Sequence, residues 1–209
     1  MKFRFKTQQY QVDAVNAIVD VFKGQPFINY EEYTRDLGVV KKDKFQKISM
    51  FDMDENNSLI IDDNDDIGYS NAAIKITDEK ILDNIREIQS KSNLHESKNL
   101  SKSLGTVSLD VEMETGTGKT YVYTRTMFEL NKRYGWSKFI IVVPSIAIRE
   151  GVHKSLEQTK DHFMELYGKK IRFFIYNSSN LGLIDQFSKD SSINVMIINI
   201  QAFNTRSGD

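Results

Sequence analysis

The sequence contains no cysteine, carries almost no net charge and has no long hydrophobic run. Without cysteine there can be no disulfide and no zinc site that needs thiolate ligands, and the absence fits a reducing cytosol. The N-terminal stretch MKFRFKTQQY lacks the apolar core of a signal peptide. No apolar run approaches the ~20 residues that cross a bilayer. We therefore expect a cytoplasmic protein with no membrane partner.

A formal net charge of −1 at pH 7 means that no global positive field indicates a nucleic-acid partner. A protein that holds DNA in a local groove need not be basic overall, so DNA stays open as a partner. The 209 residues suffice for one domain with a sizeable core, or for one domain that carries a large insertion.

The sequence shows no pattern for a metal site that is built from protein side chains alone. The three histidines show no metal-ligand spacing. An acidic stretch places Asp63, Asp65 and Gly68 at positions 1, 3 and 6 of an EF-hand loop. Positions 5 and 12 are then Ile67 and Ile74, which cannot ligate calcium. We interpret this stretch as a solvated acidic loop.

The first 105 residues divide into an N-terminal helix and a polar region. In residues 1–26, apolar side chains at helical spacing predict a helix from about Gln8 to Phe22. Residues 27–105 form a heterogeneous inserted region, in which Asp52–Asp66 holds seven acidic residues and no Lys or Arg. We expect a poorly ordered loop at this acidic stretch, outside the ligand site described below.

The inserted region also contains one amphipathic helix. Ile81, Ile85 and Ile88 recur at helical spacing, and the helix can begin at Thr77 or Asp78. The following residues, 90–103, are rich in Ser, Asn and Lys and are typical of a flexible link.

From residue 106 to residue 209, strand-like and helix-like segments alternate, which is typical of an α/β fold with a parallel sheet. The continuous β-branched run Phe139–Val143 predicts a strand buried on both faces. The predicted strands are Thr106–Met113, Phe139–Val143, Ile171–Tyr176 and Ile193–Ile200, and the predicted helices are Gly118–Arg133, Ile146–Tyr167 and a shorter one near Leu183–Ser188.

The segment Met113–Thr120, METGTGKT, lies between a predicted strand and a predicted helix, which is the context of a phosphate-binding loop. Gly116 and Gly118 let the backbone curl and turn its N–H groups inward, and the helix N-terminus adds partial positive charge. Lys119 can reach the β- and γ-phosphates, and the Thr120 hydroxyl can ligate Mg²⁺. We therefore predict a site for ATP and Mg²⁺ made by Thr115, Gly116, Thr117, Gly118, Lys119 and Thr120.

The match to the phosphate-loop pattern G-x-x-x-x-G-K-[ST] is incomplete, because Met113 stands at the position of the first glycine. The substitution is familiar in helicase-type loops, where the glycines nearer the lysine carry the bend. The alternative interpretation is a glycine-rich turn without a ligand.

Tyr10 and Gln11 stand at the start of the first predicted helix. In helicase-type motors a glutamine in such a pair contacts the adenine edge, because an amide offers both a donor and an acceptor. We assign Tyr10 and Gln11 to the nucleotide site on this ground. A solvated Gln11 beside a core tyrosine is the alternative.

Two segments at the expected carboxyl edge of the sheet are candidates for DNA contacts, since open α/β sheets bind ligands at this edge. After the strand that ends at Val143, Pro144 and Ser145 lead into a helix with Arg149 nearby. Backbone N–H groups and a hydroxyl in this arrangement can contact a phosphodiester. An ordinary strand-to-helix turn explains the same residues.

The second candidate segment follows the last predicted strand. Gln201 and Asn204 lie at the same expected edge and can contact a DNA backbone, or they can cap a following helix. The residues leave both interpretations open.

The quoted motifs together resemble the Res subunit of type III restriction enzymes. The resemblance rests on METGTGKT, on the continuing helix YVYTRTMFELNKRYGWSKF and on FIIVVPSIAIREGV, with Y-Q near the N-terminus and INIQAFN near the C-terminus. It covers residues 1–26 and about 106–209.

The resemblance implies a superfamily 2 motor with a RecA-like fold, whose parallel sheet follows an insertion between the first helix and the phosphate loop. Such subunits hydrolyse ATP, move along double-stranded DNA and carry a nuclease domain far downstream. They act with a separate methyltransferase subunit that recognises the DNA sequence.

The family pattern also includes parts that these 209 residues do not show. After the phosphate loop there is no D-E pair at a strand end, and we find no second motor domain with an arginine finger and no nuclease motif. The resemblance therefore implies an N-terminal fragment that binds ATP and hardly hydrolyses it. Another superfamily 2 translocase or a non-enzymatic nucleotide-binding module stays as an alternative, whereas a P-loop kinase has no role for the Y-Q pair.

Overall fold

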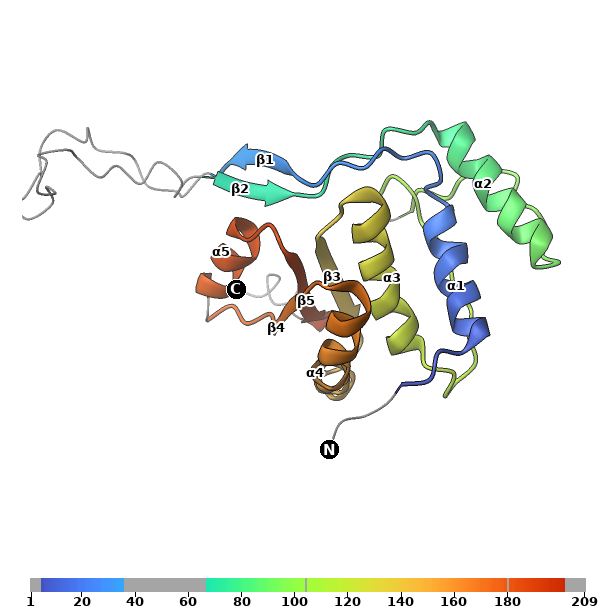
Figure 1. The fold of residues 1–209 in the computed structure, drawn as a ribbon. Helices are drawn as coiled ribbons and strands as arrows, with labels where there is room; N and C mark the ends of the chain where they lie inside the picture. Colours follow the sequence, from blue (N-terminus) through green and yellow to red (C-terminus); the bar gives the residue numbers. More distant parts are fainter. Residues whose placement is uncertain (1–4, 36–66, 104, 180, 202–209) are drawn as a thin grey trace, which may run out of the picture.

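The computed structural model describes residues 5–35, 67–103, 105–179 and 181–201. Figure 1 shows helix α3 between helix α1 on one side and a three-stranded sheet on the other. In chain order the elements are α1 (Gln9–Asp20), β1 (Glu31–Thr34), β2 (Ile67–Ser70), α2 (Asp78–Lys91), α3 (Lys119–Tyr134), β3 (Lys138–Val143), α4 (Ile146–Tyr167), β4 (Ile171–Ile175), α5 (Leu181–Lys189) and β5 (Ile193–Asn199).

The three-stranded sheet has the order β3-β5-β4, and both pairs are parallel. Val143 at the end of β3 lies opposite Asn199 at the end of β5, so the two strands reach the same carboxyl edge. This arrangement confirms the expected α/β fold with a parallel sheet, because parallel neighbours need the crossover helices that the sequence pattern predicts.

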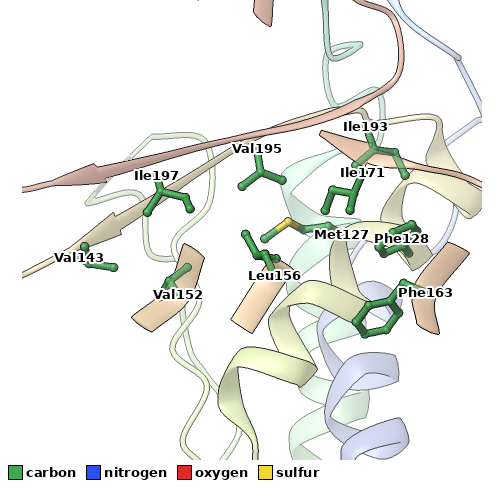
Figure 2. Close-up of a cluster of buried hydrophobic side chains, with 10 residues drawn as sticks. All are labelled: Met127, Phe128, Val143, Val152, Leu156, Phe163, Ile171, Ile193, Val195 and Ile197. Carbon is green, nitrogen blue, oxygen red and sulfur yellow. The ribbon is translucent and has the colours of Figure 1, made fainter. Parts of the chain in front are cut away.

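One face of the sheet is covered by α3 and α4, which together make the main hydrophobic core (Figure 2). Val195 and Ile197 of β5 are fully buried there, against Phe128 of α3 and Leu156 of α4. The Phe128 and Phe163 rings stack with centroids 5.2 Å apart, which ties the two helices together. Truncating a buried Phe to Ala typically costs about 3–5 kcal/mol, so this layer holds α3 firmly on the sheet.

The other face of the sheet is covered only in part. Helix α5 packs there, with the Phe187 ring 6.0 Å from the Phe174 ring of β4. On β3, however, Ile140 and Val142 are 56% and 52% exposed. The prediction that Phe139–Val143 is buried on both faces is therefore wrong. Alternate side chains of a strand point to opposite faces, and among the described residues α5 does not reach these two.

The predicted strand Thr106–Met113 is also wrong, because the structure has no strand in this segment. A strand needs a neighbour for its backbone hydrogen bonds, and in the described sheet β3 pairs with β5 alone. The apolar side chains of Val107, Leu109 and Met113 pack instead against the cluster around α1. These apolar side chains are thus partly buried by packing, without the backbone hydrogen bonds of a strand.

A second cluster joins α1 to the far side of α3 and to α2. Val15, Val19 and Ile81 are almost completely buried in it. The predicted amphipathic helix is confirmed as α2, and its Thr77 cap accepts a hydrogen bond from the Lys80 N–H at 3.3 Å. The buried Asn84 amide donates to two carbonyls at the end of α1, both at 2.9 Å.

Before α2 in the chain, the inserted region contains a two-stranded antiparallel sheet, β1-β2. The sequence pattern did not predict this sheet. Its neighbour Asn71 accepts from the Ser137 and Lys138 N–H groups, both at 2.8 Å, at the start of β3. Arg35 pairs with Asp185 and donates to Ser188 Oγ at 2.8 Å on α5. The Arg35 guanidinium lowers the pKa of the Asp185 carboxyl. The described part of the inserted region is thus anchored to the sheet and to α5.

The sequence predicts a flexible link at residues 90–103 and a poorly ordered loop at Asp52–Asp66. The irregular stretch after α2 is bound back onto the helix, since Ser97 N–H donates to the Gln89 side chain at 2.8 Å. The acidic stretch Asp52–Asp66 lies outside the described residues. Within the described ranges, no helix combines the length and the apolar composition that a membrane span requires.

Candidate phosphate-binding site

The predicted phosphate loop forms a tight turn directly before α3. Thr117 closes the turn, because its N–H and its hydroxyl both donate to the Glu114 carbonyl, at 3.4 and 2.7 Å. Gly116 and Gly118 have φ values of +84° and +88°. These are left-handed conformations that would cost another residue roughly 1–2 kcal/mol. The two glycines of the motif are therefore required by the backbone that the loop adopts.

The N-terminus of α3 has no side-chain cap. The helix begins at Lys119, and its N-cap Gly118 has no side chain to offer. In contrast, Thr77 of α2 and Ser145 of α4 each accept a backbone N–H of their own helix. The first N–H groups of a helix have no intrahelical partner, and they carry the positive end of the helix dipole. At α3 they remain available to an anion.

Two side chains at this helix end, Lys119 and Thr120, are those that the sequence predicts for a triphosphate and a magnesium ion. Lys119 is exposed and makes no ion pair or hydrogen bond with the described part of the chain. Thr120 places a hydroxyl in the first turn, and its carbonyl is held in the helix by Thr124 Oγ1 at 2.7 Å. Around residue 116 there is open space, because a Cβ on Gly116 would meet no atom within 4 Å. The loop is therefore open on the side to which a Gly116 side chain would point.

The magnesium ion would depend on the ligand for most of its coordination. Within the described ranges there is no group of three His, Asp or Glu side chains that could hold a metal. Mg²⁺ in phosphate sites is commonly held by one or two protein oxygens together with phosphate oxygens and water. The Thr120 hydroxyl would be the protein oxygen in such a coordination shell.

Tyr10 and Gln11, the two residues of α1 that the sequence analysis assigns to a nucleotide site, contact the backbone of the loop. The Tyr10 hydroxyl donates to the Thr117 carbonyl at 3.1 Å, and Gln11 Nε2 donates to the same carbonyl at 3.0 Å. Gln11 is only 9% exposed, so the alternative of a solvated glutamine does not hold. In this structure its amide nitrogen contacts the loop backbone.

Gln11 also limits what can stand at residue 118. A Cβ added to Gly118 would lie 2.6 Å from Gln11 Nε2, which is closer than real Cβ contacts come. Gly118 is thus constrained twice, by its positive φ and by the side chain packed against it.

Sequence reasoning missed an aromatic group next to the loop. The Tyr121 hydroxyl lies 3.1 Å from His162 Nε2 of α4, and the Phe5 ring lies 4.9 Å from the His162 ring. Burial lowers the pKa of His162, and the charge of Arg125 lowers it further. These contacts join the first turn of α3 to α4. No local spacing indicates them, since the residues come from three separate segments.

Of the candidate DNA-contact residues, Pro144, Ser145 and Gln201 lie at the carboxyl edge of the sheet, where β3 and β5 end. Ser145 Oγ accepts the Ile148 N–H at 3.3 Å and so caps α4, as the ordinary strand-to-helix turn would. Pro144 precedes it after β3. Gln201 accepts a hydrogen bond from Asn199 at 2.9 Å. Strand pairing brings these two segments to the same edge, which the sequence predicted.

The charge available at this edge is small in the described residues. Arg149 pairs with Glu150 at 2.9 Å, and its side chain is only 20% exposed. Asn204 lies outside the described residues. That these residues contact DNA therefore stays a prediction.

Comparison with known proteins adds the family context. A sequence model of the family described as "Type III restriction enzyme, res subunit" matches residues 4–208. The type III restriction-modification enzyme EcoPI Res subunit of Escherichia phage P1 is 35% identical over 147 residues, which cover 65% of this chain and 15% of that protein. The EcoP15I Res subunit of Escherichia coli is 33% identical over 155 residues, covering 66% of this chain and 16% of that protein.

A third relative, the StyLTI Res subunit of Salmonella typhimurium, is 37% identical over 118 residues, which cover 48% of this chain and 12% of that protein. The chain therefore spans only a small part of the length of the relatives that it matches, between 12% and 16%.

Proposed function

The chain belongs to the family of type III restriction enzyme Res subunits, and from this premise we propose that it binds Mg-ATP as the nucleotide-holding part of a DNA-translocating restriction subunit. The observation that carries the proposal is the uncapped N-terminus of α3, preceded by two left-handed glycines and followed by Lys119 and Thr120.

The residues have distinct roles in the proposed complex. The first N–H groups of α3 and the loop backbone bind the phosphates, and Lys119 meets the β- and γ-phosphate charge. Thr120 contributes its hydroxyl to Mg²⁺, and the bound ion neutralises the charge that phosphoryl transfer develops. Thr115 and Thr117 belong to the proposed nucleotide-binding loop, and Tyr10 and Gln11 are the proposed contacts on the base side of the nucleotide.

The proposal extends to the partners of the whole protein. The relatives are named as subunits of restriction-modification enzymes, which supports double-stranded DNA as the track and a methyltransferase subunit as the protein partner. Pro144, Ser145, Arg149, Gln201 and Asn204 are the proposed contacts to the DNA backbone. A reducing cytoplasm is the compartment that the cysteine-free sequence favours.

Hydrolysis by this chain alone is proposed to be near background. Turnover by phosphate-loop motors needs an oriented water and a cation for the transition state, and an arginine finger alone is worth roughly 10³–10⁵ in rate. After the loop, the sequence contains no D-E pair that could orient the water. A steady-state phosphate-release assay with and without duplex DNA measures this. DNA-stimulated turnover that vanishes in Lys119→Ala would contradict it.

Calorimetric titration of the chain with Mg-ATP and with AMP tests the binding proposal. The loop offers its donors to the β- and γ-phosphates, so Mg-ATP should bind well and AMP, which lacks both groups, should bind far more weakly. Equal binding of the two nucleotides, or no binding of Mg-ATP, would overturn the assignment of the loop.

A further inference from the structure

Two side chains of α1 converge on one backbone oxygen of the phosphate loop. The Thr117 carbonyl accepts the Tyr10 hydroxyl at 3.1 Å and Gln11 Nε2 at 3.0 Å. Gln11 Nε2 also lies 3.5 Å from the Tyr10 hydroxyl oxygen, so the three groups form one small cluster. An amide that only contacted a base would not need to hold the loop backbone in this way.

The geometry of the peptide bond gives this cluster a consequence for phosphate binding. A trans peptide is planar, and its C=O and N–H point in opposite directions. Holding the Thr117 carbonyl toward α1 therefore turns the Gly118 N–H away from α1. Glycine accepts positive and negative φ with similar ease, so Gly118 by itself does not select one orientation of this peptide. The two donors select it.

Resting on the proposed function, we infer that Tyr10 and Gln11 are positioning residues for the phosphate loop, acting through the Thr117–Gly118 peptide on phosphate affinity. They hold this peptide so that the Gly118 N–H joins the donors that face the phosphates. This role is separate from base recognition and does not require a base. It predicts that both residues affect ligands that consist of phosphate alone.

The rest of α1 is fixed independently, which makes the role testable by small changes. Val15 and Val19 are buried in the cluster shared with α2 and α3. Arg133 of α3 binds Asp20 at 2.7 Å and Asn16 at 3.0 Å. Removing the Tyr10 hydroxyl therefore leaves α1 in place and changes only the contact with the loop.

The experiment compares Mg-ATP with magnesium tripolyphosphate, which carries three phosphates and no base. Tyr10→Phe keeps the ring and removes the donor, and Gln11→Leu keeps the approximate volume and removes the amide. Tyr33→Phe on β1 is the matched control, because Tyr33 is 44% exposed and lies on a strand that pairs with β2, not with the loop. Affinities come from calorimetry and folding from thermal unfolding of each variant.

We expect Tyr10→Phe and Gln11→Leu each to weaken tripolyphosphate binding by about two- to tenfold, the range of one net hydrogen bond. Tyr10→Phe should weaken Mg-ATP by the same factor, and Tyr33→Phe should change neither ligand. Unchanged tripolyphosphate affinity in both α1 variants, with weaker Mg-ATP in Gln11→Leu, would show base recognition alone and overturn the inference. A parent chain that binds neither ligand would instead overturn the proposed function itself.

Discussion

The N-termini of α3 and α4 differ in both the conformation and the side chain of the N-cap residue: Gly118 is left-handed, with φ +88°, and Ser145 is extended, with φ −146°. Ser145 caps α4 with its own hydroxyl, which accepts the Ile148 N–H at 3.3 Å. Gly118 stands at the same position of α3 and offers no cap. A side-chain cap satisfies one of the orphan N–H groups and stabilises the helix, whereas a glycine leaves them for a ligand. The difference shows that helix α3 gives up a stabilising contact at the end that we assign to phosphate.

The cations in the first turns of α4 and α3 also differ, because one is ion-paired within the chain and the other is not. Arg149 in the first turn of α4 is paired with Glu150 at 2.9 Å. Lys119 in the first turn of α3 is exposed, and no ion pair is found for it within the described ranges. One helix end is closed by its own chain, and the other keeps its donors and its charge available.

Gly118→Ala should have the largest effect, because it places a Cβ on the left-handed residue directly before α3. Alanine at φ +88° costs roughly 1–2 kcal/mol. The end of the Gln11 side chain, 2.6 Å from the added Cβ, must also move aside. It then gives up its hydrogen bond to the Thr117 carbonyl, worth about 1 kcal/mol. Urea unfolding measures the total. Gly168→Ala, at the C-cap of α4, is the matched control, since Gly168 has φ +66° and a Cβ there meets no atom within 4 Å. Equal losses in the two variants would remove the role of the Gln11 contact.

Lys119→Ala should weaken Mg-ATP binding by about 1.5–3 kcal/mol, the scale of a hydrogen bond to a charged group. The exposed Lys132 lies in the last turn of the same helix, so Lys132→Ala removes the same charge away from the loop. Calorimetry with Mg-ATP compares the two variants with the parent. Parent-like affinity in Lys119→Ala would exclude Lys119 from the site.

Ser145→Ala tests the closed helix end. Loss of the cap should destabilise the chain by about 1 kcal/mol, within the range of 0.5–2 kcal/mol for such caps, and should leave Mg-ATP affinity unchanged. Urea unfolding and calorimetry give the two values. If the stability of Ser145→Ala equals that of the parent, the hydroxyl does not cap α4 and the comparison with α3 loses its basis.

Gln11→Ala addresses the base and should have the smallest effect. If the Gln11 side chain contacts adenine, the parent prefers ATP over GTP, and the variant loses most of that preference, on the order of 1 kcal/mol. Competition titrations with both nucleotides measure the ratio. Equal binding of ATP and GTP by the parent would leave Gln11 with the loop as its sole contact.

Local features of the fold were predictable from the sequence, and nonlocal ones were not. The helix Ile146–Tyr167 and the Thr77 start of α2 were predicted because caps and helical periodicity depend on neighbours within one turn. The strand at Thr106–Met113 was predicted wrongly because its side-chain pattern suits a strand but says nothing about a ladder partner. The exposure of Ile140 had the same cause, since burial of a sheet face depends on which elements cover it.

The sequence by itself determined the local backbone and side-chain chemistry of the predicted phosphate loop. Glycines where the backbone is left-handed, a lysine and a threonine at the first turn, and a helix without a cap all follow from Gly116–Thr120. Only the tertiary structure decided that Tyr10 and Gln11 hold the Thr117 carbonyl, across 107 and 106 positions of the chain. A turn or a cap is formed by residues that are already close, whereas this contact exists because buried side chains pack α1 along α3.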